Sequence, residues 1–335
     1  MYYQQNFPIF FSTLKLEESE FFKYIENQAD FIAKTYEHYG FIRNIIFDNL
    51  EPEIYTLSKK VKGNTIVQSF IEKTPNKSIN VFNKIKDHIY ELSMDDHGTY
   101  VVQKLIKNIQ EEYIPHISKE LKGHTLELIN SKNGYRVLQN LIPRQREEDN
   151  DRIYEEIKEN LIYFSKDKHS CFVVQEILQK CNEVTYRKIV QEIWENLNDF
   201  INNIFGNYII TLILEDKNIK NIIDLDKLYP LIKGHIFDFS LSKNASRIIE
   251  SALELGNEIQ RKNIINEILE LDKVKKDCLT TLAKDPHGNY IVQLLLRFSD
   301  NITREYIIKI ILSDPNAENG NGPFVLEYIN KIKHE

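Results

Sequence analysis

The chain has 335 residues, of which 42% are hydrophobic and 28% are charged, and its formal net charge at pH 7 is −7. This composition is that of a globular protein and excludes a largely disordered or collagen-like chain. The negative charge argues against a protein that binds polyanions through bulk electrostatic attraction alone. The three cysteines (Cys171, Cys181 and Cys278) form no C-x-x-C pair, which excludes a disulfide framework and predicts a reducing compartment.

The N-terminal residues predict neither a signal peptide nor a membrane span. Their only apolar run is Phe7–Phe11, which lacks a basic flank and is too short to cross a bilayer. We therefore expect a cytoplasmic location, with a nuclear one as the alternative, and no membrane association. Residues 1–24 are interpreted as an N-terminal cap that ends at the start of a helix, with Ser19 as its N-cap.

A short segment recurs along nearly the whole chain. It consists of a small residue, a polar residue, an aromatic or cationic residue, two aliphatic residues and then usually Gln. Between their last residues, from Gln68 to Gln293, successive copies are separated by 35, 36, 36, 36, 39 and 43 residues. A period in this range indicates a helical solenoid. The seven clear copies start at Gly63, Gly98, Gly134, Ser170, Gly206, Ala245 and Gly288.

Further segments complete each period. An amphipathic stretch such as Val81–Leu92 lies between copies and has the i, i+4 apolar spacing of a helix with one buried face. The two longer periods place extra residues around Asp216–Lys220 and Leu271–Lys276, which we interpret as surface loops. Degenerate copies at Asn27–Ala33 and Asn319–Ile329 are expected as the first repeat and the C-terminal cap. The predicted organisation is all-α, with one domain over residues 1–335, eight repeats over 25–310 and a C-terminal cap over 311–335.

The recurring segment has two distinct faces when it is drawn as a helix. Counted from the small residue as zero, positions 3, 4, 7 and 8 are aliphatic and predict a continuous core. Positions 1, 2 and 5 fall on another side, within about 100° of arc. Position 2 is mostly planar or cationic: Thr65, Tyr100, Arg136, Phe172, Tyr208, Arg247 and Tyr290. Position 5 is Gln68, Gln103, Gln139, Gln175, Thr211, Glu250 and Gln293.

This second face predicts a nucleic-acid contact. A single glutamine there is best explained as part of a solvated helix surface, but neither helix formation nor packing requires flat and amide side chains to recur. Planar groups and guanidinium planes stack on bases, and polar groups one turn apart can bond a base edge. The pattern therefore favours a splayed single strand of RNA, with one base per repeat.

The segment Gly288–Gln293, which reads G-N-Y-I-V-Q, and its relatives resemble the repeats of the PUF (Pumilio-family) RNA-binding domain over nearly the whole chain. The resemblance implies a right-handed α-α superhelix, crescent shaped, of eight three-helix Pumilio-type repeats with terminal caps. It also implies that positions 1 and 5 bond the Watson–Crick edge of a base, that position 2 stacks, and that repeat 8 takes the 5′ base. No cofactor and no catalysis are implied, and a monomer is expected.

Carried over residue by residue, the resemblance assigns bases to the two C-terminal repeats. Repeat 8 resembles a uracil reader, with Asn289 and Gln293 at the base edge and Tyr290 stacking. Repeat 7 resembles a guanine reader, formed by Ser246, Arg247 and Glu250. The chemistry of repeat 7 agrees, because a carboxylate accepts hydrogen bonds from both guanine N1–H and N2–H₂, and adenine does not offer these donors together.

The other repeats depart further from the family pattern. In repeat 6 Thr211 replaces the expected glutamine, in repeat 5 Phe172 takes the place usually held by Arg, and Tyr135 at an edge position of repeat 4 predicts little base selectivity. The expected readers are Asn207, Tyr208 and Thr211 (repeat 6, uracil), Cys171, Phe172 and Gln175 (repeat 5, adenine), Tyr135, Arg136 and Gln139 (repeat 4), Thr99, Tyr100 and Gln103 (repeat 3, compatible with adenine), and Asn64, Thr65 and Gln68 (repeat 2, uracil). Repeat 1 (Ala29, Asp30 and Ala33) reads no base, and Phe324 of the C-terminal cap joins the RNA-binding set.

Taken from repeat 8 downward, the predicted target is 5′-UGUANAUN-3′. The resemblance implies binding to messenger RNA 3′ untranslated regions and post-transcriptional repression or decay, with protein co-regulators on the convex face or near residues 271–276. Stacking at about 1–3 kcal/mol per base would sustain binding without a large ionic term. The surplus carboxylates are then expected on the convex side, and the salt dependence is expected to be modest.

Two alternatives remain open. A protein-binding scaffold of the armadillo or HEAT kind stacks helices in a similar way, although it does not predict the face formed by positions 1, 2 and 5. A nucleolar, rRNA-processing PUF relative would keep RNA binding, but such proteins tend to be more basic and to have eroded base readers. An enzyme is disfavoured, because His97, His169 and His287 precede the core helices without further ligands at metal spacing.

Overall fold

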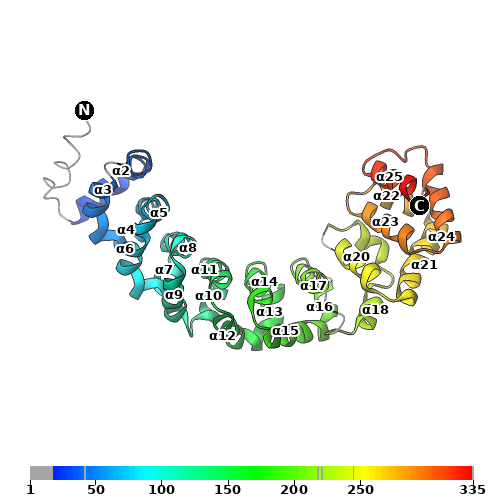
Figure 1. Cartoon of the computed structure of the whole chain (residues 1–335), viewed down its shortest axis with the longest axis horizontal. Helices are drawn as coiled ribbons and strands as arrows, with labels where there is room; N and C mark the ends of the chain where they lie inside the picture. Colours follow the sequence, from blue (N-terminus) through cyan, green and yellow to red (C-terminus); the bar gives the residue numbers. More distant parts are fainter. Residues whose placement is uncertain are drawn as a thin grey trace. The chain divides into compact units, whose positions relative to one another are not determined.

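The computed structural model of the protein describes residues 18–40, 43–201, 203–216, 219, 222–243 and 245–333. Regular structure in these ranges is helical throughout and includes no strand, which confirms the predicted all-α class (Figure 1). None of the described helices combines the length and apolar character that crossing a bilayer requires. Residues 1–17 of the predicted N-terminal cap lie outside the described residues, as do residues 217, 218 and 220 of the predicted loop at Asp216–Lys220.

The described helices follow one pattern, in which two helices precede a third. Helix α2 (Glu18–His38) comes first and already includes Ser19, so the prediction that Ser19 is an N-cap is wrong. The triplets are α3 (Arg43–Leu50), α4 (Ile54–Ser58) and α5 (Gly63–Lys73); α6 (Pro75–Ile85), α7 (Ile89–Met94) and α8 (Gly98–Asn108); α9 (Ile114–Leu121), α10 (Thr125–Asn130) and α11 (Gly134–Leu141); α12 (Glu147–Ile157), α13 (Leu161–Lys166) and α14 (Ser170–Lys180); α15 (Glu183–Glu195), α16 (Leu197–Ile201) and α17 (Gly206–Leu214); α18 (Leu228–Ile232), α19 (Ile236–Leu241) and α20 (Ser246–Leu255); and α21 (Glu258–Lys275), α22 (Cys278–Lys284) and α23 (Gly288–Phe298). Helices α24 (Asn301–Ser313) and α25 (Gly322–Lys333) follow.

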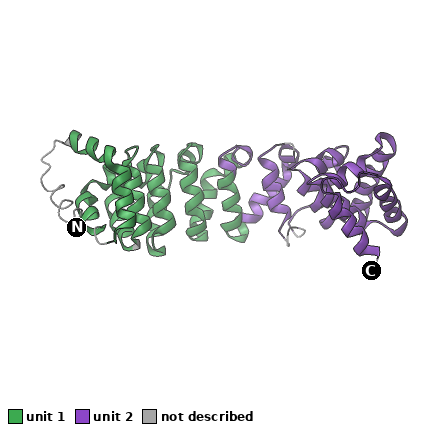
Figure 2. Cartoon of the chain, turned by 90° about the horizontal axis from the view of Figure 1, so that it is seen from above, with its two compact units in different colours: residues 1–161, 172–185 green, residues 162–171, 186–335 purple. Residues whose placement is uncertain are grey.

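The chain divides into two compact units (Figure 2). The first unit comprises Met1–Leu161 and Phe172–Thr185, and the second comprises Ile162–Cys171 and Tyr186–Glu335. Within the first unit α2, α5, α8 and α11 pack side by side in that order, and within the second α17, α20, α23 and α25 do the same. We call α5, α8, α11, α14, α17, α20 and α23 the third helices. Each of them carries one clear copy of the recurring segment.

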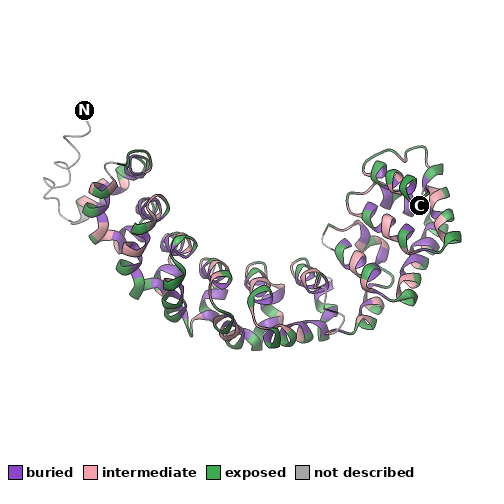
Figure 3. Ribbon diagram, viewed as in Figure 1, coloured by how far each residue is buried: buried purple, intermediate pink, exposed green. Residues whose placement is uncertain are grey.

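The predicted core face of the third helices is buried (Figure 3). In α8 the side chains at positions 3, 4, 7 and 8 (Val101, Val102, Leu105 and Ile106) have no exposed surface, and the matching four in α23 have none either. Burial of each such aliphatic side chain contributes roughly 1.5–3 kcal/mol. The 3.6-residue period in the sequence therefore corresponds to the packing that holds each repeat together.

The start of α23 is fixed by a close contact and a hydrogen-bonded turn. A Cβ atom at Gly288 would lie 2.7 Å from the carbonyl oxygen of Leu282, so only a residue without a side chain lets α23 approach α22 this closely. Three residues earlier, Asp285 Oδ1 accepts hydrogen bonds from the backbone N–H groups of His287 and Gly288, each at 2.8 Å. These bonds satisfy two of the donors that a helix N-terminus leaves free.

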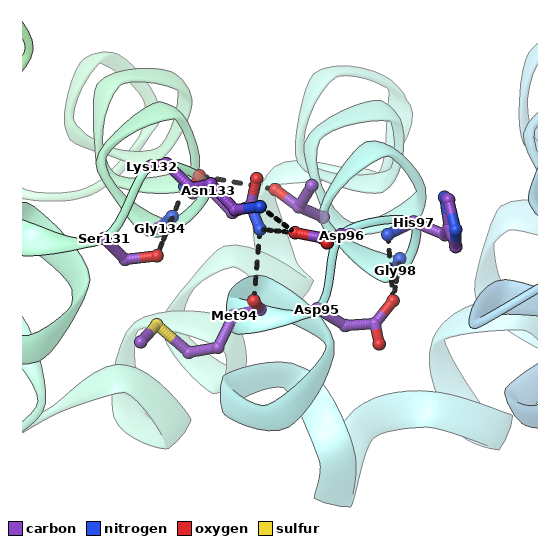
Figure 4. A network of polar contacts seen from close by, with 10 residues as sticks. Met94, Asp95, Asp96, His97, Gly98, Ser131, Lys132, Asn133 and Gly134 are labelled. Carbon is purple, nitrogen blue, oxygen red and sulfur yellow. Dashed lines mark hydrogen bonds and ion pairs between the residues drawn. The ribbon is translucent and has the colours of Figure 1, made fainter. Parts of the chain in front are cut away.

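Successive turns in the first unit are also bonded to one another, as Figure 4 shows. Asp95 Oδ1 accepts from the N–H groups of His97 and Gly98 at 2.9 and 2.7 Å, so it caps its own helix α8. Asn133 Nδ2, in the next turn, donates to Asp96 Oδ1 at 2.9 Å and to the carbonyl oxygen of Met94 at 3.2 Å. The turn before α11 is thereby bonded directly to the turn before α8.

Arginine side chains donate hydrogen bonds to carbonyl oxygens at the C-termini of several third helices. Arg304 of α24 donates from Nε to the carbonyl oxygen of Leu296 at 2.8 Å and from Nη2 to that of Ser299 at 3.0 Å. Arg261 of α21 bonds the end of α20 in the same way, and Arg144 bonds the carbonyl oxygens of Ile106 and Ile109 at the end of α8. A cation at a helix C-terminus satisfies free carbonyls and interacts favourably with the helix dipole.

Two of the predicted segments differ from the structure. The stretch Val81–Leu92 is divided by a 3₁₀ turn at Lys86–His88 into α6 and α7, although Ile85 and Ile89 on either side are both fully buried. The surface loop predicted at Leu271–Lys276 is wrong for most of its length, because α21 continues to Lys275. Its extra residues contain no Gly or Pro, so they lengthen the helix instead of forming a loop.

The short connection from α21 to α22 is strained. Among the described residues, Lys276 (φ 54°, ψ 155°) and Asp277 (φ 65°) are the two non-glycine residues with positive φ. The buried Asp272 holds them in place, since its Oδ1 accepts from Leu279 N–H at 2.9 Å and its carbonyl oxygen accepts from Lys276 N–H at 2.9 Å. The conformation of Lys276 is one that glycine adopts readily and other residues avoid.

Substitution of Lys276 by Gly is therefore expected to stabilise the protein by about 1 kcal/mol, because it relieves this backbone strain. The measurement is the urea unfolding midpoint of Lys276→Gly against the unaltered chain. Lys275→Gly, one residue earlier at the end of α21, is the matched control and is expected to destabilise, since glycine is unfavourable within a helix. Equal effects of the two substitutions would contradict the assignment of strain to Lys276.

Candidate nucleic-acid interface

Positions 1, 2 and 5 of the third helices share one face but differ in exposure. Position 1 is buried in every case: Asn64, Thr99, Tyr135, Cys171, Asn207, Ser246 and Asn289. Position 2 is exposed in every case, and its four aromatic side chains are Tyr100, Phe172, Tyr208 and Tyr290. Position 5 is partly buried throughout. Six of the seven third helices thus present a flat or cationic group beside a partly covered polar group, and α5, with Thr65 at position 2, is the exception.

The Asn–Gln pair of α23 forms a local hydrogen-bonded unit. Asn289 Nδ2 donates to the carbonyl oxygens of Asp285 and Pro286 at 2.9 and 3.0 Å, and Gln293 Nε2 donates to Asn289 Oδ1 at 3.3 Å. Both N–H groups of Asn289 are occupied, and its side chain is 2% exposed. The outward hydrogen-bonding capacity therefore lies on Gln293, which keeps a second N–H donor and its Oε1 acceptor.

The same arrangement occurs at two sites in the first unit. In α5, Asn64 Nδ2 donates to the carbonyl oxygens of Lys60 and Val61, each at 2.8 Å, and Gln68 Nε2 donates to Asn64 Oδ1 at 2.9 Å. In α8, Gln103 Nε2 donates to Thr99 Oγ1 at 2.9 Å. The buried residue at position 1 orients the glutamine at position 5, so each glutamine presents a donor and an acceptor in a fixed direction.

Helix α17 lacks this unit. Thr211 Oγ1 donates back to the carbonyl oxygen of Asn207 at 2.9 Å, along its own helix. Asn207 Oδ1 is buried and has no hydrogen-bond partner among the described residues. A buried acceptor without a donor costs roughly 1–3 kcal/mol. The replacement of glutamine by threonine at position 5 thus leaves an unsatisfied group on this face.

Helix α20 presents a carboxylate instead of an amide. Arg247 Nη1 donates to Glu250 Oε2 at 2.6 Å, and the Glu250 side chain is 13% exposed, whereas that of Arg247 is 61% exposed. Burial raises the pKa of Glu250, and the charge of Arg247 acts in the opposite direction. The ion pair leaves Oε1 of Glu250 available as an acceptor.

Helices α11 and α14 differ again. In α11, Tyr135 is buried at position 1, and its hydroxyl accepts from Arg136 Nε at 3.0 Å, so positions 1 and 2 bond each other. In α14, the buried thiol of Cys171 donates to the carbonyl oxygen of Lys168 at 3.8 Å. On α2, Ala29 and Ala33 are buried, whereas Asp30 is exposed beside Lys62. Phe324 is exposed on α25.

The third helices are basic although the chain is acidic. They carry seven basic residues (Lys73, Lys104, Lys107, Arg136, Lys180, Arg247 and Arg297) and four acidic residues (Glu72, Glu176, Glu250 and Glu254). The surplus of carboxylates in the chain therefore lies on other elements. A polyanion at the third helices would therefore be repelled less than the net charge of −7 suggests.

One feature of this face is missing from the expectations based on sequence. A groove of about 710 Å³ in the first unit is lined by residues of α8, α11 and α14, among them Lys107, Asn140 and Glu176. Pro143, which follows α11, is also part of its lining. The three histidines of interest (His97, His169 and His287) lie, as expected, in the turns before third helices.

Substitution of Thr211 by Gln is expected to stabilise the protein by about 1 kcal/mol, because the new side chain reaches Asn207 Oδ1 as Gln68 and Gln293 reach their partners. The measurement is the free energy of unfolding in urea. Thr211→Val is the control, since it removes the hydroxyl without supplying a donor, and it is expected to be neutral or destabilising. A Thr211→Gln variant less stable than the unaltered chain would show that Asn207 Oδ1 is not the limiting group.

Comparison with known proteins shows the family and the fold of the chain. A family model described as NOP9-like PUF repeat domain matches residues 51–317. The curated protein Pumilio homolog 12 of Arabidopsis thaliana is 25% identical over 111 residues, which are 32% of this chain and 17% of that protein. The chain thus matches about a sixth of the length of that curated relative.

Solved structures share the fold. The Puf3 RNA binding domain bound to a Cox17 RNA 3′ UTR recognition sequence is 22% identical, with 92% of both chains covered and a TM-score of 0.71. PUF-8 in complex with PBE-RNA is 21% identical, with 96% of both chains covered and a TM-score of 0.68. The Puf4 RNA binding domain bound to an HO endonuclease RNA 3′ UTR sequence is 24% identical, with 90% and 96% covered and a TM-score of 0.60. The chain therefore has the helical PUF repeat fold and belongs to the family of NOP9-like PUF repeat domains.

Proposed function

We propose that the protein binds single-stranded RNA, one base per repeat, through positions 1, 2 and 5 of its third helices. The observation that carries the proposal is the recurrence of a glutamine fixed by a buried neighbour beside an exposed planar group, as in Asn289, Tyr290 and Gln293. Stacking on such planar groups contributes about 1–3 kcal/mol per base. The similar Puf3 and Puf4 RNA binding domains are bound to 3′ UTR RNAs in their solved structures, which supports the same proposal.

The chemistry of the pairs assigns bases. Gln293 and Gln68 each offer one donor and one acceptor, which complement the carbonyl oxygen and N3–H of uracil. The carboxylate of Glu250 accepts from N1–H and N2–H₂ of guanine, and Arg247 beside it provides a guanidinium plane for stacking. With repeat 8 at the 5′ base, the target is 5′-UGUANAUN-3′. Its third base is bound weakly, because Thr211 does not engage Asn207 Oδ1.

The biological role follows from this specificity. The protein acts on messenger RNA 3′ untranslated regions in the cytoplasm, as a regulator of repression or decay. It does so as a single domain of eight repeats over residues 1–335, as a monomer and without a cofactor. Protein co-regulators dock on the elements opposite the third helices or beside Leu271–Lys276, the end of α21. The third helices carry seven basic and four acidic residues, so their basic surplus is only three, and the salt dependence is expected to be modest.

A second function is favoured by one specific observation. The matching family model is that of NOP9-like repeats, which supports a nucleolar, rRNA-processing PUF relative. Such a protein is expected to read bases less strictly. The degenerate pairs of α11 and α17 fit this alternative, whereas the intact pairs of α5 and α23 fit the first. The armadillo or HEAT-like scaffold has no such observation in its favour.

Binding of two RNAs separates these functions. An RNA that carries UGUAAAUA is expected to bind at least about 100-fold more tightly than the same RNA with ACA in place of UGU, because three readers of the second unit lose their bases. The measurement is fluorescence anisotropy at a fixed salt concentration. Equal affinity for both RNAs would favour the nucleolar alternative, and binding of neither would contradict RNA binding through this face.

A single side chain tests the register. Glu250→Gln is expected to shift preference at the second base from guanine towards adenine by roughly tenfold, because an amide offers a donor as well as an acceptor. Affinities for UGUAAAUA and UAUAAAUA are compared for both proteins. Glu254→Gln removes the same charge from the next turn of α20 and serves as the control. If Glu250→Gln kept its preference for guanine, the register assigned to repeat 7 would be wrong.

A further inference from the structure

The groove in the first unit lies beside a shortened helix. Helix α11 is 8 residues long. The third helices of the preceding and following repeats, α8 and α14, are 11 residues long each. Pro143 cannot donate a backbone hydrogen bond, and its ring clashes with the carbonyl four residues earlier, so the α-helix ends at Leu141 and a 3₁₀ turn follows. Pro143 and Arg144 of this 3₁₀ turn line a groove of about 710 Å³ together with residues of α8, α11 and α14.

All residues that line the groove belong to the first unit. Two planar side chains at position 2, Arg136 and Phe172, are among them, and Phe172 is 43% exposed. They come from neighbouring repeats, 4 and 5. A flat aromatic group placed between an aromatic ring and a guanidinium plane gains stacking and cation–π interactions. The groove is therefore suited to a planar ligand.

Two polar groups in the groove have no partner. Gln139, at position 5 of α11, makes no hydrogen bond within the described residues, because Tyr135 bonds Arg136 instead. Glu176, at position 6 of α14, is partly buried and makes no hydrogen bond or ion pair there either. Burial raises the pKa of Glu176, and the charge of Lys180 opposes that shift. A partly buried carboxylate without a donor is costly unless a ligand supplies one.

A carboxylate at this place restricts what the groove can hold. It repels phosphate groups and carbonyl oxygens, and it accepts hydrogen bonds from amino groups. The exocyclic amino group of cytosine is such a donor, and carboxylate side chains recognise it in nucleic acids. Uracil has the same shape as cytosine but presents the oxygen O4 at that position. The two pyrimidines thus differ at the exocyclic group, which is a hydrogen-bond donor to a carboxylate in cytosine and an acceptor in uracil.

We propose that the groove binds the base opposite repeat 4, the fifth base of the target, and that Glu176 selects a base with an exocyclic amino group over uracil. This inference rests on the proposed function, and it makes the fifth position selective where Tyr135 alone predicts little selectivity. Gln139 completes the edge contact as a second hydrogen-bonding group. Phe172 and Arg136 hold the two faces of the base.

The test compares RNAs that differ only at the fifth base. The unaltered protein is expected to bind UGUACAUA about tenfold more tightly than UGUAUAUA. Glu176→Gln, which keeps the side-chain size and removes the charge, is expected to reduce this ratio to about one. Glu159→Gln removes the same charge from the 3₁₀ turn between α12 and α13, outside the groove, and is expected to keep the ratio. Phe172→Ala is expected to weaken binding of both RNAs without changing the ratio.

Three results would overturn the inference. These are equal binding of the two RNAs by the unaltered protein, a ratio that survives in Glu176→Gln, and an equal loss of the ratio in Glu159→Gln. None of them affects the dependence on UGU, which the repeats of the second unit read. Loss of binding to every UGU-containing RNA would instead contradict the proposed function itself, so the two failures are distinguishable.

Discussion

The rest of the structure depends on the close packing of each third helix against the short helix before it. At Gly288 the distance leaves no room for a Cβ atom, and the side chain of Asp285 ties down the first N–H groups of the helix. This double constraint sets both the start and the rotation of the helix. Once they are set, positions 3, 4, 7 and 8 must face the core, and positions 1, 2 and 5 must share the opposite side.

Much of this could be predicted from the sequence, because the relevant signals are local. The aliphatic period gives the core, and the recurrence of Gln at position 5 gives the candidate face. The division of Val81–Leu92 into two helices could not be predicted, because the buried residues Ile85 and Ile89 continue one apolar stripe across the break. The sequence pattern does not distinguish a bent segment from a straight one when both bury the same side chains.

Features that depend on distances between side chains could not be predicted from the sequence either. The sequence indicates that Thr211 is a weak substitute for Gln, but only the structure reveals that Asn207 Oδ1 is thereby left without a donor. Pro143 is visible in the sequence as a helix breaker. Only the structure reveals that Pro143 lines a groove together with Gln139 of its own repeat and Glu176 of the next one. Such consequences arise from the stacking of repeats and not from any one of them.

The arginine side chains at the ends of third helices bear on where this protein can be divided. Because Arg304 lies on α24 and bonds the carbonyl oxygen of Leu296 in the last turn of α23, a chain cut at Phe298 would expose that carbonyl and unravel the final turn of α23. The boundary of a repeat defined by stability thus falls one helix later than the boundary defined by sequence similarity. Any shortened form that is meant to keep the eighth reader intact has to retain the first turn of the helix that follows it.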